Sequence, residues 1–192
     1  MNKKTSAKIS ALAAVVLLAG ATAPAVASPF DRGPVADFLT LFRQSAIPKR
    51  LVVWSHPQYK AGTVVVSTKE RRLYYVLGGG QAIEYGVGVG REGFTWSGVK
   101  TVTRKREWPD WTPPSAMLRR RPDLPRHMAG GVENPLGARA LYLGSSDYRI
   151  HGSNEPDTIG AAVSSGCIRM TNNDVIDLYS RVRPGTKVVV LR

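Results

Sequence analysis

The 192-residue chain has few cysteines, histidines and acids: one Cys, three His and 14 Asp plus Glu, against 27 Lys plus Arg. A single cysteine excludes a disulfide within the chain, so its thiol is either a small buried side chain or a reactive group. No CxxC or HxxxH spacing occurs, and we therefore expect no metal site. The shortage of acids leaves a formal net charge of +13. This charge favours an anionic partner, either nucleic acid, an acidic membrane surface or a polymer that carries carboxylates.

Long apolar runs are also lacking, and the one candidate lies at the N-terminus. Three lysines within the first eight residues precede the apolar stretch 11–19, and Ala25-Val26-Ala27 follows it. This order is typical of a secretory signal peptide, which we assign to residues 1–27. Gly20 and Pro24 interrupt the run too early for a comfortable membrane span, although an uncleaved anchor is the alternative. The cysteine of a lipoprotein signal is absent, so we expect no lipid anchor.

Glycine and proline are plentiful, with 19 and 13 residues, and frequent turns favour a β-rich fold. Short β-prone segments between turn residues predict strands at 51–54, 63–68, 72–77, 81–89, 98–107, 138–143, 149–151 and 187–191. Two-residue alternation places four side chains on one side of their strand, namely Ile83, Tyr85, Val87 and Val89. We expect one short helix at 113–120, capped by Thr112, and another that begins after Asn172 or Asn173.

The remaining segments divide the chain into a leader, a spacer and one domain. Residues 28–50 form a polar lead-in in which 35–42 could be a short helix. Residues 51–192 form the domain, within the usual size of a single folding unit. Segment 108–131 is rich in Pro, Trp and Arg and is predicted to be a lid over a cleft. A structural excursion with buried tryptophans is the alternative.

Two patterns invite a nucleotide or nucleic-acid interpretation, and we reject both. Gly86-Val87-Gly88-Val89-Gly90 has the spacing of neither the dinucleotide fingerprint nor the P-loop, and no helix follows it. Glycines at a strand end that another backbone approaches closely explain it better. The basic residues of 98–107 are interpreted as the charged face of an edge strand rather than as a nucleic-acid patch.

The only cysteine lies in Ser164-Ser165-Gly166-Cys167-Ile168-Arg169, sixteen residues after His151. A thiolate is a strong nucleophile when a base or cation assists it, and His151 and Arg169 are the candidates. Gly166 allows a tight turn and lets a substrate carbonyl approach the N–H groups of Gly166 and Cys167 as an oxyanion hole. The small residues around Cys167 favour a nucleophile over a core cysteine.

These residues carry a family resemblance. His151-Gly152-Ser153-Asn154, followed by Ser164-Ser165-Gly166-Cys167-Ile168-Arg169-Met170, resembles the signature of the L,D-transpeptidase catalytic domain, the YkuD-like family. The resemblance covers about residues 51–192. Ser153 stands where Thr is common, and Ser165 stands where some members carry His, so a second imidazole beside the thiol is missing.

The resemblance implies a mainly β sandwich or barrel-like catalytic domain at 51–192 with one or two short helices. It implies an exported enzyme of peptidoglycan synthesis, and so of cell-wall biogenesis and cell shape. Cys167 would attack a tetrapeptide stem, release D-alanine and pass the acyl group to a second stem as a 3→3 cross-link. His151 would be the base, and no metal or cofactor would be needed. The oxyanion or substrate contacts would come from six residues: Gly152, Ser153, Ser164, Ser165, Gly166 and Arg169.

Several alternatives stay open. The acceptor could be an outer-membrane protein or water, or the enzyme could cleave such links. Arg169 could bind a stem carboxylate or brace its loop. A non-catalytic wall-binding module is the competing function. In each case we expect a location in the periplasm or cell wall, no nucleic-acid partner and no stable membrane anchor after signal cleavage.

Overall fold

The computed structural model describes residues 38–39, 41–42 and 46–192. The expected signal peptide at 1–27 and half of the expected helix at 35–42 lie outside the described residues. Among the residues described, no helix is long and apolar enough to cross a membrane.

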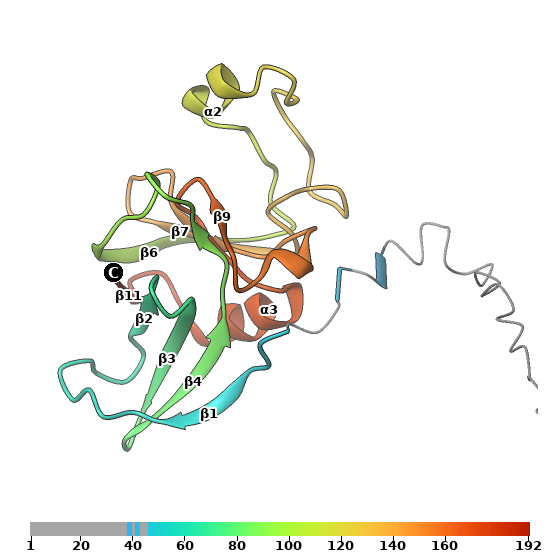
Figure 1. The fold of residues 1–192 in the computed structure, drawn as a ribbon. Coiled ribbons are helices and arrows are strands. Elements are labelled where there is room, and N and C mark those ends of the chain that lie inside the picture. Colours follow the sequence, from blue (N-terminus) through green and yellow to red (C-terminus); the bar gives the residue numbers. More distant parts are fainter. Residues whose placement is uncertain (1–37, 40, 43–45) are drawn as a thin grey trace, which may run out of the picture.

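Strands dominate the architecture (Figure 1). One nine-stranded sheet has the order β1-β4-β3-β2-β11-β6-β7-β8-β10, and β5 pairs with β9 in a second, small sheet. The strands are β1 Arg50–Val53, β2 Val64–Ser67, β3 Arg72–Gly78, β4 Gln81–Gly86, β5 Val89–Gly90, β6 Gly98–Glu107, β7 Arg139–Leu143, β8 Arg149–His151, β9 Ala162–Ser164, β10 Ile168–Arg169 and β11 Lys187–Leu191. The predicted mainly β fold is confirmed.

Strand β6 joins the two halves of the large sheet. Its first residues, Gly98–Thr101, pair with β11, whereas Val102–Glu107 pair with β7, and the register shifts between Val102 and Arg104. A long strand with an irregularity of this kind can bend from one layer into another. The prediction of an edge strand at 98–107 holds for each half taken separately, because the two pairings do not overlap and each half has one partner. The sequence did not indicate that the two halves pair with different strands.

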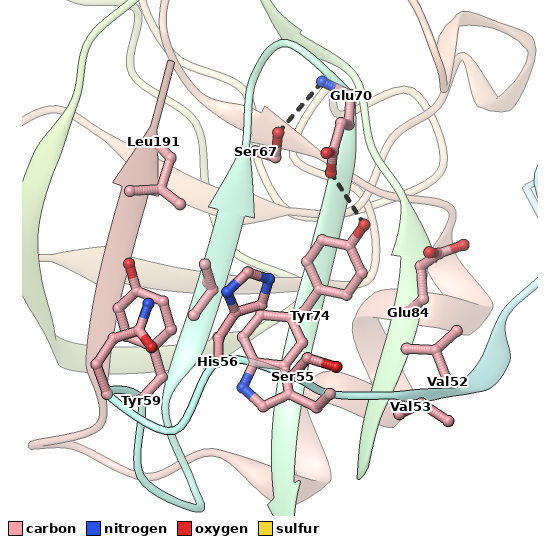
Figure 2. Close-up of a pocket in the computed structure, with 13 residues that line it drawn as sticks. Val52, Val53, Ser55, His56, Tyr59, Ser67, Glu70, Tyr74, Glu84 and Leu191 are labelled. Carbon is pink, nitrogen blue, oxygen red and sulfur yellow. Dashed lines mark hydrogen bonds between the residues drawn. The ribbon is translucent and has the colours of Figure 1, made fainter. Parts of the chain in front are cut away.

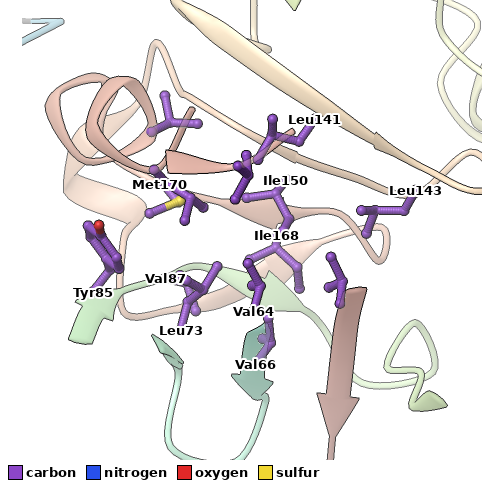
Figure 3. Packing of buried hydrophobic residues seen from close by; sticks show 14 of the residues in the cluster. Val64, Val66, Leu73, Tyr85, Val87, Leu141, Leu143, Ile150, Ile168 and Met170 are labelled. Carbon is purple, nitrogen blue, oxygen red and sulfur yellow. The ribbon is translucent and has the colours of Figure 1, made fainter. Parts of the chain in front are cut away.

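The core fills the space between the two halves (Figure 3). Val64, Leu73 and Tyr85 come from one half, and Leu141 and Ile150 come from the other; each has no exposed surface. The alternation predicted for Ile83 to Val89 is confirmed, because all four side chains belong to this cluster.

Helices within the described part of the chain are α2 Ser115–Arg120 and α3 Asn172–Arg181, with a 3-10 turn η2 at Pro156–Thr158. Both predicted helices occur, but their caps differ. Thr171 caps α3 by accepting a hydrogen bond from the Asp174 N–H, because its hydroxyl lies one residue ahead of the asparagines that we expected to cap the helix. Helix α2 follows Pro114 and has no side-chain cap, so Thr112 is not its N-cap.

The glycine-rich stretch at 86–90 behaves as expected. A Cβ on Gly90 would overlap the Phe94 carbonyl and lie 3.3 Å from the Gly166 Cα, and one on Gly88 would lie 3.2 Å from the Thr158 carbonyl. Close backbone approach explains these glycines. Through them β5 lies against the loop that carries Cys167.

Candidate active site

The parallel pairing of β8 with β10 brings the cysteine and the histidine segments together. Ile168 is in register with Ile150, and Arg169 with His151. The two isoleucines are fully buried in the core. Because side chains alternate along a strand, Arg149, His151 and Arg169 share the opposite face. Cys167 directly precedes β10, two residues before Arg169, and its thiol interacts electrostatically with Arg149 and Arg169.

His151 is held as a neutral base. Its side chain is buried, and Nδ1 lies 2.6 Å from the Gly152 carbonyl oxygen. A carbonyl can only accept, so Nδ1 carries the proton and Nε2 is left as the acceptor. Burial lowers the pKa of His151 from 6.5 to about 3, and the charges of Arg169 and Arg149 act in the same direction.

Cys167 is held as a neutral thiol. Its Sγ lies 3.6 Å from the Asp147 carbonyl oxygen, within reach of a weak S–H donor bond. Burial raises the pKa of Cys167, and this effect outweighs the opposing contributions of Arg149 and Arg169. The resting pair is thus thiol and imidazole rather than thiolate and imidazolium. A neutral thiol acts as a nucleophile only where a positioned base takes its proton.

The turn before Cys167 is fixed by its own polar groups. Ser164 Oγ donates to the Cys167 carbonyl at 2.6 Å and accepts from the Gly166 N–H at 3.1 Å. Gly166 has φ of 112°, where a side chain would be strained, and an added Cβ would lie 2.6 Å from the Tyr148 ring. The tight turn expected at Gly166 is therefore present. Ser165 receives only a long contact from Arg91, at 3.4 Å.

An aromatic wall lines this turn. Trp96 donates from its indole nitrogen to the Gly166 carbonyl at 2.8 Å, and its ring stacks on Tyr148 at 4.5 Å between centroids. The Lys100 ammonium lies 5.6 Å from the centroids of both rings. Trp96 could not be selected from the sequence, because nothing in its own segment indicates a contact with a residue seventy positions away.

Two arginines flank the thiol, and only Arg169 was selected from the sequence. Arg169 donates to the Glu155 carboxylate at 3.0 Å, which braces the loop after β8. Arg149 Nε is buried and forms no hydrogen bond among the described residues. An unpaired buried guanidinium nitrogen lowers the stability of the fold. Such a nitrogen is typical of a side chain that pairs with a bound ligand or with a negative charge formed during a reaction. Arg149 could have been selected from the sequence, because it lies two residues before His151 and therefore on the same face of the strand.

The residues after His151 are fixed by Asn172. Its Oδ1 accepts from the N–H groups of Ala138 and Ser153, at 2.9 and 3.3 Å, and a Cβ on Gly152 would overlap it. The Ser153 hydroxyl accepts from the Glu155 N–H at 2.9 Å. Gly152 and Ser153 thus serve the shape of the loop in this structure.

The predicted lid contacts Phe94, whose carbonyl lies next to the turn at Gly166. Segment 108–131, which contains α2, projects from the half of the sheet that holds β6 and β7 (Figure 1). The Arg120 guanidinium lies 4.9 Å from the Phe94 ring centroid, and that of Arg91 lies 4.3 Å from the same ring. The backbone of the segment is tied by the bridge between Trp111 and Met128. Among the described residues no three His, Cys, Asp or Glu side chains gather as metal ligands.

Comparison with known proteins shows the family. The L,D-transpeptidase catalytic domain family, YkuD, matches residues 61–190. A probable L,D-transpeptidase of Escherichia coli, ErfK/SrfK, is 37% identical over 157 residues, which are 77% of this chain and 49% of that protein. The chain spans about half the length of the curated relatives it matches.

Solved structures share the fold. An Enterococcus faecium L,D-transpeptidase superposes with a TM-score of 0.55 at 20% identity, over 71% of this chain and 52% of that one. A Brucella melitensis protein described as a probable carnitine operon oxidoreductase is 42% identical, with a TM-score of 0.52, over 79% of this chain and 98% of that one. That description names an activity different from the one in the names of the curated relatives.

Proposed function

Because the chain belongs to the L,D-transpeptidase catalytic domain family, we propose that it is an exported cysteine transpeptidase that acts on peptidoglycan stem peptides. What supports this best is the β8–β10 register, in which Arg169 lies opposite His151, together with the electrostatic interaction of the Cys167 thiol with Arg149 and Arg169. The two segments that carry the expected catalytic residues thus lie side by side, with His151 in β8 and Cys167 directly before β10.

The proposed reaction begins with a proton transfer. His151 Nε2 accepts the thiol proton as the Cys167 sulfur attacks the stem carbonyl, and a tetrahedral oxyanion forms. The Gly166 N–H already donates to Ser164, so we assign the oxyanion to the Cys167 N–H, with the positive charge of Arg149 nearby. Collapse of this intermediate breaks the amide bond, and the imidazolium of His151 returns its proton to the departing D-alanine amine. A thioester remains on Cys167.

In the second half of the reaction Cys167 is the leaving group and an amine is the nucleophile. An acceptor amine attacks the thioester carbonyl, His151 removes the amine proton, and the thiol leaves with a proton restored. The thioester retains the energy of the broken amide, so no nucleotide is consumed. With a stem side-chain amine as acceptor the product is a 3→3 cross-link. The aromatic wall and segment 108–131 would limit access of water to the thioester.

The basic surface suits this substrate. Peptidoglycan stems carry carboxylates, and the chain carries a formal charge of +13. The guanidinium groups of Arg91 and Arg120 lie 4.3 and 4.9 Å from the Phe94 ring centroid. We assign stem-carboxylate recognition to these arginines, since Arg169 is already paired with Glu155.

Export completes the proposal. Residues 1–27 are proposed as a cleaved signal peptide and 28–50 as a lead-in to the catalytic domain at 51–192, with the enzyme in the periplasm or cell wall. In an alternative form of this proposal the donor half of the reaction is the same, and the acyl acceptor is an outer-membrane protein.

The test uses the purified chain with a disaccharide-tetrapeptide, beside a Cys167→Ala control. We expect mass spectrometry to show free D-alanine and a 3→3 dimer with the wild-type chain, and neither product with Cys167→Ala. Loss of D-alanine without a dimer would identify water or a protein as acceptor. No change in the substrate with the intact thiol would refute the proposed activity. Fast alkylation of Cys167 is not a requirement, because the resting thiol is protonated.

A further inference from the structure

A second hollow lies on the other half of the sheet. It is a pocket of about 450 Å³ lined by residues of β1, β2, β3, β4, β11 and the 54–59 segment. In the sheet order these strands occupy one end, whereas β8 and β10 with the Cys167 site occupy the other. The pocket shares no residue with that site.

Strand alternation places this pocket on the outer face of the sheet. Val64 and Val66 point into the core, so Val65 and Ser67 between and after them point outward into the pocket. Tyr74 on β3 has the same relation to Leu73. The segment after β1 crosses this face, and Figure 2 shows labelled rings from it spread over the strands. The pocket is therefore a space between the sheet and its covering segment.

Aromatic rings form its wall. The Trp54 ring lies 5.1 Å from the Tyr74 centroid, 4.8 Å from the His56 centroid and 6.1 Å from the Tyr59 centroid. Exposed apolar surface continues beside them, since Val53 is 84% exposed. Rings with adjacent apolar surface favour ligands that present C–H faces.

Several polar groups in the pocket can form hydrogen bonds beyond those that they make in the structure. Trp54 Nε1 is buried and has no acceptor among the described residues. Leaving such a donor unpaired is unfavourable, so a ligand that supplies an acceptor oxygen is stabilised by pairing with it. Glu84 and Glu70 line the same pocket, and each carboxylate has more acceptor sites than its contacts with Arg50, Arg72 and Tyr74 use.

This combination selects one class of ligand. Two carboxylates in the lining disfavour an anion, and the polar lining disfavours a purely apolar chain. A neutral sugar presents C–H faces to rings and hydroxyl donors to carboxylates. An acetamido group adds a carbonyl acceptor for the indole N–H and a methyl for the apolar surface. Each feature of the pocket thus has a counterpart in an N-acetylated hexosamine.

We propose that this outer-face pocket, built around Trp54, Tyr74 and Glu84, binds a short neutral oligosaccharide of N-acetylated hexosamines. The pocket's chemistry alone carries this inference. The proposed function enters only in naming the natural source, the glycan strand of the wall. A glycan held here leaves the thiol cleft free for the stem peptide.

The experiment titrates the full chain with N-acetylchitotetraose to about 10 mM, a range that detects millimolar affinity. The signals are the backbone amide resonances, which give the affinity of every variant, and the indole N–H resonance of Trp54 in the same ¹⁵N–¹H spectrum, assigned by its loss in Trp54→Phe. We expect this resonance to shift with saturation. Trp54→Phe keeps a ring and removes the donor, so its affinity should fall about fivefold. Trp54→Ala should lose about tenfold or more.

Matched variants locate the site. His56→Ala removes a pocket ring and should weaken binding, whereas His127→Ala, an exposed histidine outside the pocket, should not. If the Trp54 resonance does not shift, or if the pocket variants bind as well as the wild type, the proposal is overturned. His56→Ala keeps the test valid if Trp54→Ala fails to fold in a thermal melt.

Failure of the enzymatic proposal would look different. Turnover of a sugar-free tetrapeptide should be equal in the wild type and Trp54→Phe, because the pocket lies away from Cys167. Absence of turnover in both proteins would refute the proposed function and leave saccharide binding to be decided by the titration alone.

Discussion

Replacement of His151 by Gln should remove a large pH dependence of folding stability. The folded pKa of His151 is lowered from 6.5 to about 3 by burial. The unfolded chain therefore binds more protons between these values, and stability is lost as the pH falls through this window. From about pH 7 to about pH 4.5 the unfolded state gains roughly 2.5 kcal/mol from this one group.

The assay is urea unfolding of the wild type and His151→Gln at both pH values. Gln cannot titrate, but its amide can still donate to the Gly152 carbonyl. Asp177, whose pKa is lowered to about 2, contributes equally to both proteins and cancels in the comparison. We expect the wild type to lose about 2.5 kcal/mol more than the variant, and exposed His127→Gln to behave as the wild type. Equal losses in wild type and His151→Gln would refute the buried, neutral imidazole.

Three further substitutions test the site and its support. Arg149→Gln removes a cation that lowers the pKa of Cys167, so alkylation of the thiol at about pH 8 should slow by about threefold to tenfold; an unchanged rate would contradict the contact. Gly166→Ala forces a side chain at φ of 112° against an aromatic ring and should lose about 1–3 kcal/mol and most thiol-dependent turnover; full activity would contradict the fixed turn. Tyr85→Phe removes a 2.6 Å hydrogen bond to the Asp177 carboxylate and should cost about 1.5–3 kcal/mol in thermal or urea unfolding; no change would show that the bond contributes nothing.

Much of the fold could be predicted because its elements are locally encoded. Runs such as Val64 to Ser67 and Lys187 to Leu191 are β-prone and are bounded by turn residues, and both are strands. Strands β9 and β10 were missed because they have only three and two residues. Such short pieces exist through their partners rather than through their own propensity.

The division of β6 between two partner strands was missed for a related reason. Charged residues along 98–107 are compatible with an edge, but they do not show that the two halves of the strand pair with different neighbours. Partner number depends on the pairing of Lys187–Leu191 with the first half of β6 and of Arg139–Leu143 with the second. Those pairings are long-range and leave no local signal.

In the site, too, some residues are indicated by the local sequence and others only by long-range contacts. The Cys167 and His151 segments were selected from residue chemistry and family resemblance, and the tight turn at Gly166 followed from glycine's freedom. Arg149, Trp96 and Asn172 were not selected, because their roles depend on contacts that only the folded chain creates. A sequence pattern identifies reactive groups more readily than it identifies the residues that hold them.

The central claim is that Cys167 carries the acyl group. The direct measurement is the intact mass of the protein, quenched in acid shortly after mixing with a tetrapeptide stem. The account predicts a mass increase equal to the stem without its terminal D-alanine, located on Cys167 by peptide mapping and absent from Cys167→Ala. An unmodified Cys167 during active release of D-alanine, or the same adduct in Cys167→Ala, would contradict it.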